Sequence, residues 1–283
     1  KTAGYLFMGD DPNYPGSQHS SVQKVVYSVD VWSQLPNFPY ASKYALSAGN
    51  QTKAIIGGGT MPGYTSRAYK FTYATESYSE ELSLPPNNSG PGNGERAETA
   101  STGNSEKFYV ATGNMPSGIN STIFKYTLTT DVFQSIANRM SRSRRWAKAA
   151  GNSTAGYWAG GQSPAPIYTT MDKLDYSTDT ATYTPGANLS QGRNRFYGTA
   201  PRMNGLGAST TPGISPYRWV DNWGGTYDGG WYVGGRETNY PGATLVYTSK
   251  VYKTSYAHDT TESAPSLVSV TAGFCGVVNN NTT

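Results

Sequence analysis

The stretch Lys173-Leu-Asp-Tyr-Ser-Thr-Asp179 is one of five copies of the same phrase in this chain. In each copy a lysine is followed three residues later by an aromatic residue or leucine, and six residues later by an acid. The other copies are residues 24–30, 70–76, 125–131 and 253–259. Their acids lie 46, 55, 48 and 80 residues apart, so the period is nearly constant until a longer last interval. Such self-similarity predicts an array of equivalent structural units with an insertion before the last phrase.

Each phrase follows a short apolar run that ends in glycine, such as Gly156-Tyr-Trp-Ala-Gly-Gly161. Runs of this length, rich in Tyr, Trp, Val and Ile, are typical of buried strands, because helices need longer periodic segments. Gly-Asn precedes three of the runs, at 49–50, 103–104 and 151–152. Both residue types adopt positive φ at low cost, so these dipeptides indicate tight turns. The pattern predicts four antiparallel strands per repeat, for example a first strand from Arg145 and an outer strand from Thr182 to Pro185, with almost no helix.

The order basic-x-x-x-small, aromatic-x-x-Gly-Gly, Tyr-x-x-Asp and an outer strand ending near proline resembles the kelch repeat of β-propellers, over the whole chain. The sequence motifs at residues 151–161 and 173–180 are also similar to motifs in the repeat arrays of virion structural and tail-fibre-like proteins of cyanophages and other marine phages. One departure from the kelch pattern is that the outer-strand tryptophan occurs only as Trp32, with Tyr78, Phe133 and Tyr183 in the other repeats.

The two ends of the chain correspond to different strands of the repeat, and this indicates how the array closes. Residues 4–9 read as the second strand of a repeat, whereas residues 270–278 followed by Asn279-Asn-Asn-Thr-Thr283 read as a first strand and its turn. We therefore expect an all-β, five-bladed kelch-like propeller of four-stranded antiparallel blades, in which the C-terminal strand completes the first blade and leaves no open seam. The whole chain, 1–283, is then one domain, with an insertion loop at 201–229. An open fragment of a longer array is the alternative.

Composition narrows the classes of partner. Charged residues make up 14% of the 283 residues, against about 25% in an ordinary soluble domain, and the net charge is +4. Basic residues concentrate only between Arg139 and Lys148, which does not form a phosphate-binding stripe, so nucleic acid is not an expected partner. No apolar run approaches the roughly 18–20 residues that span a bilayer. Membrane insertion is therefore not expected either.

The residue types of common enzyme sites are scarce. Two histidines, His19 and His258, and one cysteine, Cys275, do not suffice for a thiolate or imidazole zinc site. The five repeated acids are interpreted as turn residues that bond their own backbone two residues further on. We interpret the repeated lysines as cross-strand or solvated, and the repeated tyrosines as packing between repeats. Asp10 and Asp11 are interpreted as solvated loop residues, not as a cation site. We thus expect no catalytic residues, no metal and no cofactor.

Two features interrupt the repeat and carry the candidate binding residues. Exposed aromatic rings stack on sugar rings, and neighbouring polar groups hydrogen-bond the sugar hydroxyls. The insertion loop offers this combination, although packing of the loop on the propeller or on a neighbouring subunit explains it equally well. Its candidate ligand-binding residues are Tyr217, Arg218, Trp219, Asp221, Trp223 and Tyr227.

The second feature is the set of long loops that follow the apolar runs. These loops should emerge together on one face, because alternate strand connections leave on alternate faces, and the insertion should lie on the opposite face. In kelch proteins the corresponding face commonly binds partners, so the resemblance implies a partner face here. Its candidate residues are Asp10, Asp11, Tyr14, Tyr64, Tyr168 and Tyr240.

These observations favour a non-enzymatic recognition or structural module. The resemblance of the repeat motifs to those of phage proteins predicts a phage fibre or surface component, located in the virion or outside the cell. Such a component would bind a host-surface glycan or protein. Multivalent display supplies avidity for weak individual contacts, through homo-oligomers or attachment to a longer fibre. A secreted carbohydrate-binding or carbohydrate-active propeller is the first alternative, since fold alone does not fix function. A purely structural subunit that contacts other virion or filament proteins is the second.

Overall fold

The chain is all-β throughout its described part. The computed structural model describes residues 3–10, 18–26, 29–50, 52–60, 63–79, 81–86, 94–195, 197–199, 229–233, 236–239, 244–247, 250–255 and 258–264. Within them lie 25 strands and one turn of 3-10 helix, η1 (Pro185–Ala187). No helical segment in these ranges has the length and hydropathy that crossing a membrane requires.

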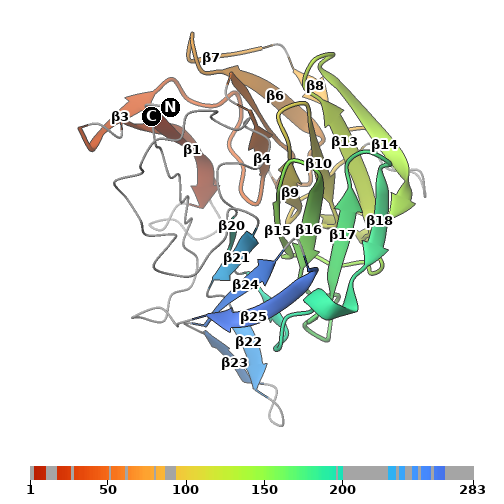
Figure 1. Ribbon diagram of the computed structural model, residues 1–283. Helices are drawn as coiled ribbons and strands as arrows, with labels where there is room; N and C mark the ends of the chain where they lie inside the picture. Colours follow the sequence, from red (N-terminus) through yellow and green to blue (C-terminus); the bar gives the residue numbers. More distant parts are fainter. Residues whose placement is uncertain are drawn as a thin grey trace, which may run out of the picture.

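Five antiparallel sheets follow one another in chain order (Figure 1), and the strands of each sheet lie in the order in which the chain forms them, except that β7 and β8 both pair with β6. The first sheet contains β1 (Ala3–Asp10), β2 (Gln18–Val26) and β3 (Val31–Leu35). The second contains β4 (Leu46–Gly49), β5 (Lys53–Gly57), β6 (Arg67–Thr72), β7 (Ser77–Tyr78) and β8 (Leu82–Ser83). The third contains β9 (Ala100–Gly103), β10 (Lys107–Ala111), β13 (Thr122–Thr127) and β14 (Val132–Arg139).

The last two sheets repeat the plan. The fourth contains β15 (Lys148–Gly151), β16 (Ala155–Ala159), β17 (Met171–Asp175) and β18 (Thr180–Tyr183). The fifth contains β20 (Tyr197–Thr199), β21 (Gly229–Val233), β24 (Val251–Ser255) and β25 (Thr260–Ala264). Two hairpins lie beside the sheets, β11 (Asn114–Met115) with β12 (Gly118–Ile119), and β22 (Arg236–Asn239) with β23 (Thr244–Tyr247), where β19 (Arg193–Asn194) pairs with β22.

The lysine of the phrase occupies one register position in all five sheets. It lies opposite the same position of the preceding apolar strand: Tyr5–Lys24, Ile55–Lys70, Tyr109–Lys125, Tyr157–Lys173 and Trp231–Lys253. Directly opposed residues in an antiparallel pair project from the same face of the sheet. The phrase therefore presents a lysine and an aromatic or branched residue side by side on one face of each sheet.

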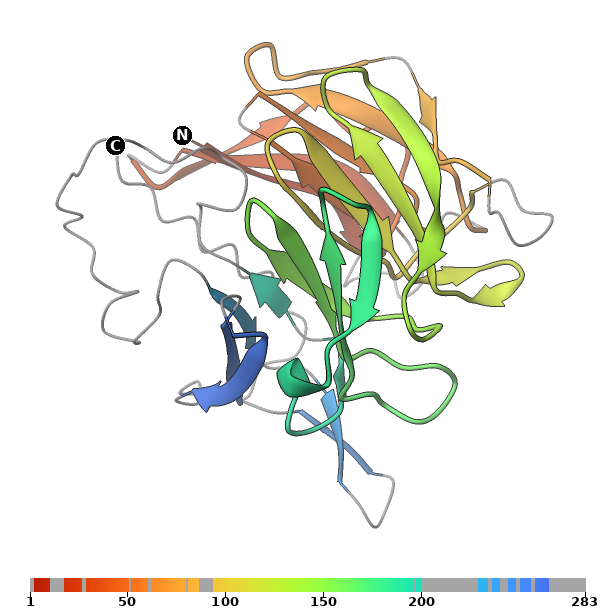
Figure 2. The ribbon, with the colours of Figure 1, turned by 45° about the vertical axis from the view of Figure 1, so that its right-hand side comes forward.

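The hydrophobic core lies between successive sheets. Each junction has its own cluster of buried residues, and alternation along the strands supplies them from both sides. At the junction of the third and fourth sheets, Tyr109 and Ile123 pack against Trp158, Leu174 and Tyr176. Sheets that bury both faces in this way must stack in chain order, as Figures 1 and 2 show.

Ion pairs join each sheet to the next one. In four junctions the lysine of the phrase reaches the acid of the following copy, not its own. The pairs are Lys24–Glu76 at 2.5 Å, Lys70–Asp131 at 2.5 Å, Lys125–Asp179 at 2.5 Å and Lys173–Asp259 at 2.9 Å. Tyrosine hydroxyls from the neighbouring sheet also donate to three of these acids: Tyr5 to Glu76, Tyr109 to Asp179 and Tyr157 to Asp259.

These pairs correct the sequence interpretation of the repeated acids and lysines. The acids do not bond their own turn: all five stand at positive φ, between 50° and 57°, at the end of a turn. This conformation turns the side chain away from its own turn, and four of the acids contact the preceding sheet. The turn role belongs elsewhere, for example to Asp175, whose Oδ1 accepts from the backbone N–H of Ser177 at 2.7 Å.

Two other expectations for the repeat are confirmed. Asn50, Asn104 and Asn152 each accept hydrogen bonds from backbone N–H groups two and three residues further on, as turn residues do. The two described tyrosines of the phrase pack between sheets: Tyr176 stacks on Tyr109 with ring centroids 5.0 Å apart, and Tyr73 stacks on Tyr5 at 5.4 Å.

Some strand ends differ from the prediction, for local reasons. The first strand of the fourth sheet begins at Lys148 and not near Arg145, because Trp146 has a φ of 56°, which extended strands do not adopt. The outer strand ends at Tyr183 and not at Pro185, where η1 begins. Proline lacks the N–H that strand pairing needs and fits the first turn of a helix.

Replacement of Asp131 tests the ion pairs between sheets. Burial favours the neutral form of this carboxyl, but hydrogen bonds from Lys53, Lys70 and Tyr126 outweigh burial and hold its pKa at about 2. A depressed pKa in the folded state stabilises the protein above the ordinary pKa, and this contribution disappears as pH falls from about 4 to about 2. We expect Asp131→Asn to cost up to about 1 kcal/mol at pH 7. The difference should vanish near pH 2 in urea denaturation.

Glu106→Gln is the matched control for that experiment. Glu106 is an exposed acid in a turn of the third sheet, and no ion pair joins it to the described residues. Its replacement should leave the free energy of unfolding unchanged at both pH values. An Asp131→Asn protein as stable as the wild type at pH 7 would show that the pairs between sheets contribute nothing.

Candidate functional site

Several connections project from one end of the stacked sheets, which we call the loop end. They include the β11–β12 hairpin and the loop after β16, which Figure 2 shows extending toward the same side. Isolated bridges tie this end together, since Lys43 pairs with Thr60 and Arg145 pairs with Gln162. The loop end thus combines the segments before the first strand of each repeat with those after its second strand.

Four residues at equivalent positions of successive repeats meet at the loop end. Tyr44, Glu98, Trp146 and Arg195 each lie just before a first strand. A chain of backbone hydrogen bonds joins them: Glu98 N–H donates to Tyr44 at 3.1 Å, Trp146 to Glu98 at 3.0 Å and Arg195 to Trp146 at 3.3 Å. The first strands β4, β9, β15 and β20 that follow also lie next to one another in this order. The fold therefore gathers one side chain from each repeat in one place.

The four residues adopt a backbone conformation that is high in energy for residues with side chains. Their φ angles are 59°, 59°, 56° and 51°, in chain order. For a residue with a side chain this left-handed conformation costs about 1–2 kcal/mol, whereas glycine adopts it freely. The repeat requires positive φ here but places Tyr, Glu, Trp and Arg. Strain held by bulky side chains concentrates at functional sites, so these residues are candidates for a role beyond folding.

The centre of the group is Trp146, over whose ring two guanidinium groups lie. Arg145 Cζ is 4.0 Å and Arg195 Cζ is 3.9 Å from the ring centroid. Arg145 Nη1 also contacts Glu98 Oε2 at 3.4 Å. Burial raises the pKa of the Glu98 carboxyl, while the two guanidiniums and the Trp146 indole offset part of that rise. We call Tyr44, Glu98, Arg145, Trp146 and Arg195 the loop-end cluster.

Buried arginines hold the base of the cluster. Arg96, Arg144 and Arg193 occupy equivalent positions two residues before Glu98, Trp146 and Arg195, and all three are fully buried. Arg144 Nη1 donates to the carbonyls of Gly160 at 3.0 Å and Thr170 at 2.9 Å. Such bonds tie the start of a first strand to the ends of the second and third strands. The cluster therefore stands on a rigid support.

Two of the residues predicted for the partner face lie beside the cluster. Tyr64 is half-buried, and its hydroxyl accepts a hydrogen bond from Asn114 Nδ2 at 2.5 Å. Tyr168 is half-buried with the Arg142 guanidinium 5.3 Å from its ring centroid. Asp10 ends β1, and its side chain lies outside the described residues. Asp11, Tyr14 and Tyr240 also lie outside them.

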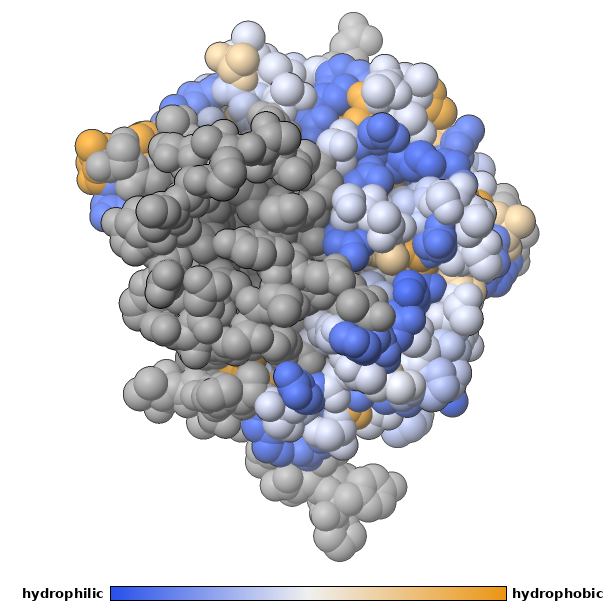
Figure 3. Space-filling view, in the orientation of Figure 1, coloured by the Kyte–Doolittle hydropathy of each residue, from blue (hydrophilic) through white to orange (hydrophobic). Residues whose placement is uncertain are grey.

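The predicted ligand-binding residues of the insertion loop all lie outside the described residues: Tyr217, Arg218, Trp219, Asp221, Trp223 and Tyr227. They remain predictions. On the face that Figure 3 presents, the described residues are mostly hydrophilic or neutral, and apolar ones are scattered. The most exposed large apolar side chains, Val29, Val31 and Trp32, lie at the turn into β3 and along it.

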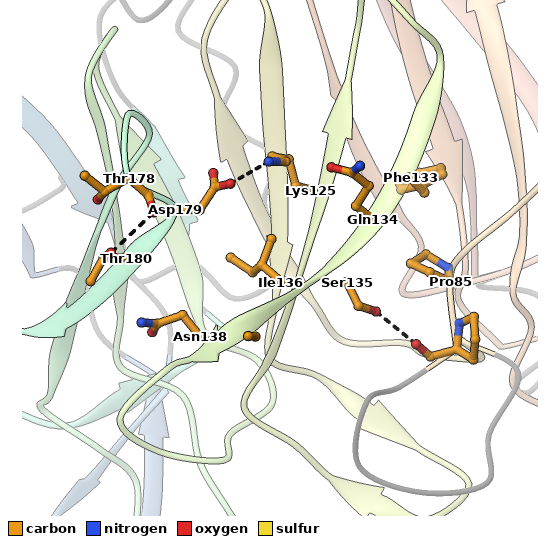
Figure 4. Close-up of a pocket in the computed structure, with 12 residues that line it drawn as sticks. Pro85, Lys125, Phe133, Gln134, Ser135, Ile136, Asn138, Thr178, Asp179 and Thr180 are labelled. Atoms are coloured by element: carbon orange, nitrogen blue, oxygen red, sulfur yellow. Dashed lines mark hydrogen bonds and ion pairs between the residues drawn. The ribbon is translucent and has the colours of Figure 1, made fainter.

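A groove on the rim is a second concave feature. It has a volume of about 790 Å³ and is lined by β14, by Pro85 and Pro86, and by the turn at Thr178–Thr180. Figure 4 shows Lys125 paired with Asp179 across it and Ser135 bonded to the Pro86 carbonyl. Its charged groups are thus already paired within the protein, and its position matches the gap left where two sheets diverge outward. The loop-end cluster is the better candidate site.

Sequence reasoning missed the loop-end cluster, although a signal existed. Tyr44, Glu98 and Trp146 each lie five residues before the glycine of a Gly-Asn turn. These residues occupy the same position in successive repeats, but their side chains differ completely. A comparison that looks for residues shared between the repeats therefore does not detect the position. Among the described residues, no group of three or more His, Cys, Asp or Glu side chains is placed to hold a metal ion.

Comparisons with known proteins bear on the fold. A solved structure titled "Structure of YjhT" superposes with a TM-score of 0.66, covering 94% of this chain and 84% of that chain, at 12% sequence identity. At this identity the likeness shows a shared fold and nothing about function. No family model and no curated protein sequence matches the chain.

Proposed function

We propose that the protein is a five-bladed β-propeller that works as a non-enzymatic recognition module, carried by a phage fibre or another virion surface component. The five sheets are its blades, and residues 270–278 supply the first strand of the blade formed by β1, β2 and β3. Support comes from the chain order of the sheets and from the core at every described junction between them. The proposed location in a virion rests on the resemblance of the repeat motifs to those of phage virion proteins.

The loop-end cluster is the proposed binding site, and a carbohydrate on a host surface is the proposed ligand. The observation that carries this proposal is the set of four strained residues that the blades bring together around Trp146. The Trp146 ring orients two guanidinium groups beside a carboxylate, and such a set of donors and acceptors can hydrogen-bond the hydroxyl groups of a sugar. The insertion loop, on the opposite face by its phase in the repeat, is a second contact with the host or with a neighbouring subunit.

Replacement of Trp146 by glycine tests the site. Relief of the positive φ offsets part of the lost packing, so we expect the free energy of unfolding to change by less than about 1.5 kcal/mol. Glycan binding, measured on an array and then by titration calorimetry, should weaken at least tenfold. Trp32→Ala is the control, because Trp32 is an exposed tryptophan on an outer strand, and its loss should leave binding unchanged. A folded Trp146→Gly protein with unaltered binding would sink the proposal.

The array should also include a chain lacking residues 203–227. Binding that disappears with this deletion and persists in Trp146→Gly would move the site to the insertion loop. A folded intact chain that binds no glycan would favour a purely structural subunit whose loops meet other virion or filament proteins.

A carbohydrate-active function is the second candidate, and Glu98 favours it. A carboxyl whose pKa is raised by burial is suited to general acid catalysis near neutral pH. Glycoside hydrolysis, however, usually needs two carboxyl groups, and Glu98 is the only carboxylate of the cluster among the described residues. Release of reducing sugar from a bound glycan, lost in Glu98→Gln, would establish this alternative.

A further inference from the structure

The arginines of the loop end fall into two groups by what their N–H donors contact. Arg96, Arg144 and Arg193 are buried and donate to carbonyl and hydroxyl oxygens and, for Arg144, to the Asp172 carboxylate. Arg145 and Arg195 instead lie over the Trp146 ring. Stacking on an indole orients a guanidinium and leaves its N–H edge available for an acceptor.

The donors of this second group are mostly unused. Arg145 Nε is buried and has no hydrogen-bond acceptor among the described residues. Within the described part of the chain, the one side-chain acceptor of Arg145 is Glu98, at a long 3.4 Å. The guanidinium of Arg195, an exposed residue, donates to no acceptor in the described part of the chain. Two oriented cationic groups with unused N–H edges therefore lie together over one aromatic ring.

Among the described side chains, the charge at the cluster is not balanced. There the two guanidiniums, which stay protonated at all physiological pH values, face the single carboxylate of Glu98. Burial raises the pKa of that carboxyl, which weakens it as a counter-ion. A bound anion would relieve the repulsion between Arg145 and Arg195, whereas a neutral ligand would not.

We infer that the loop-end cluster recognises an acidic sugar, with the ligand carboxylate bound by the guanidinium groups of Arg145 and Arg195, which Trp146 orients. Guanidinium and carboxylate form charge-assisted, often bidentate, hydrogen bonds that are about twice as strong as neutral ones. The inference rests on the proposed carbohydrate-binding function and adds the charge of the ligand to it.

Titration calorimetry with a matched pair of ligands tests the inference. Trigalacturonate and galactotriose differ in the carboxylates, and we expect the acidic trimer to bind at least tenfold more tightly. Arg145→Gln and Arg195→Gln should each reduce that preference about tenfold, because each removes one charge-assisted contact. Arg139→Gln is the control, since Arg139 is an exposed arginine on the rim strand β14, and it should keep the wild-type preference.

The outcomes separate the inference from the function on which it rests. Equal affinity for the two trimers, or an equal loss in Arg139→Gln, overturns the acidic-sugar inference and leaves carbohydrate binding standing. Binding of neither trimer overturns both for this site. Sodium sulfate, titrated alone, identifies the third case: sulfate binding that depends on Arg145 and Arg195, without binding of trigalacturonate, shows an anion site that does not recognise sugars and overturns the inference.

Discussion

Deletion of residues 265–283 is expected to destabilise the protein by at least about 5 kcal/mol and to lower its melting temperature by 10 °C or more. If the propeller closes as proposed, residues 270–278 pair with the free edge of β1, which pairs only with β2 among the described residues. The lost strand would expose Val270, Phe274 and Val277, each worth about 1.5–3 kcal/mol when buried. For a chain of this size each kcal/mol shifts the melting temperature by about 2–4 °C.

Thermal unfolding followed by circular dichroism measures this effect, and deletion of residues 279–283 alone is the control that should change little. An unchanged melting temperature in the longer deletion contradicts closure by the C-terminal strand. If the truncated protein does not fold, charge reversal of Lys253 and Asp30 is the second test of closure. Four lysines of the phrase pair with the acid of the next copy, so a closed ring brings Lys253 to Asp30. Each single charge reversal, Lys253→Asp or Asp30→Lys, should then destabilise, and the double reversal should restore stability.

The all-β character and the antiparallel sheets were predictable because the repeat encodes local structure. The apolar runs, the Gly-Asn turns and the phrase fixed the strands and their order, and Asn50, Asn104 and Asn152 form the turns that their residue types predict. Contacts between copies were less accessible. Lys125 pairs with Asp179 of the next copy and not with Asp131 of its own, and no spacing within a repeat distinguishes the two.

The candidate site was less predictable than the fold, for a related reason. Tyr44, Glu98, Trp146 and Arg195 have nothing in common chemically, and apart from the shared spacing of the first three to a Gly-Asn turn, only the backbone hydrogen bonds between them show that they belong together. Their shared property is a positive φ, which the sequence pattern of Tyr, Glu, Trp and Arg does not suggest. The insertion loop, which residue types did suggest, stays a prediction because it lies outside the described residues.

The buried pair of Arg144 and Asp172 should show the second large effect. Both side chains have an exposed fraction of 0%, and Arg144 Nη2 donates to Asp172 Oδ2. Burial lowers the pKa of the Arg144 guanidinium to about 10, which leaves it charged at neutral pH. Replacement by methionine, which is similar in length and uncharged, would leave the Asp172 carboxylate buried without its counter-ion.

We therefore expect Arg144→Met to lower the free energy of unfolding by about 3–5 kcal/mol, the usual cost of an unpaired buried charge. The double variant Arg144→Met, Asp172→Leu should recover most of this loss, because replacing both charges with apolar groups removes the desolvation penalty as well. Urea denaturation gives the three values, and Arg139→Met, on the exposed rim, should stay within about 0.5 kcal/mol of the wild type. No recovery in the double variant would mean that the carbonyl bonds of Arg144 and not its charge pair hold the loop end in place. A loss below 1 kcal/mol in the single variant would mean that neither does.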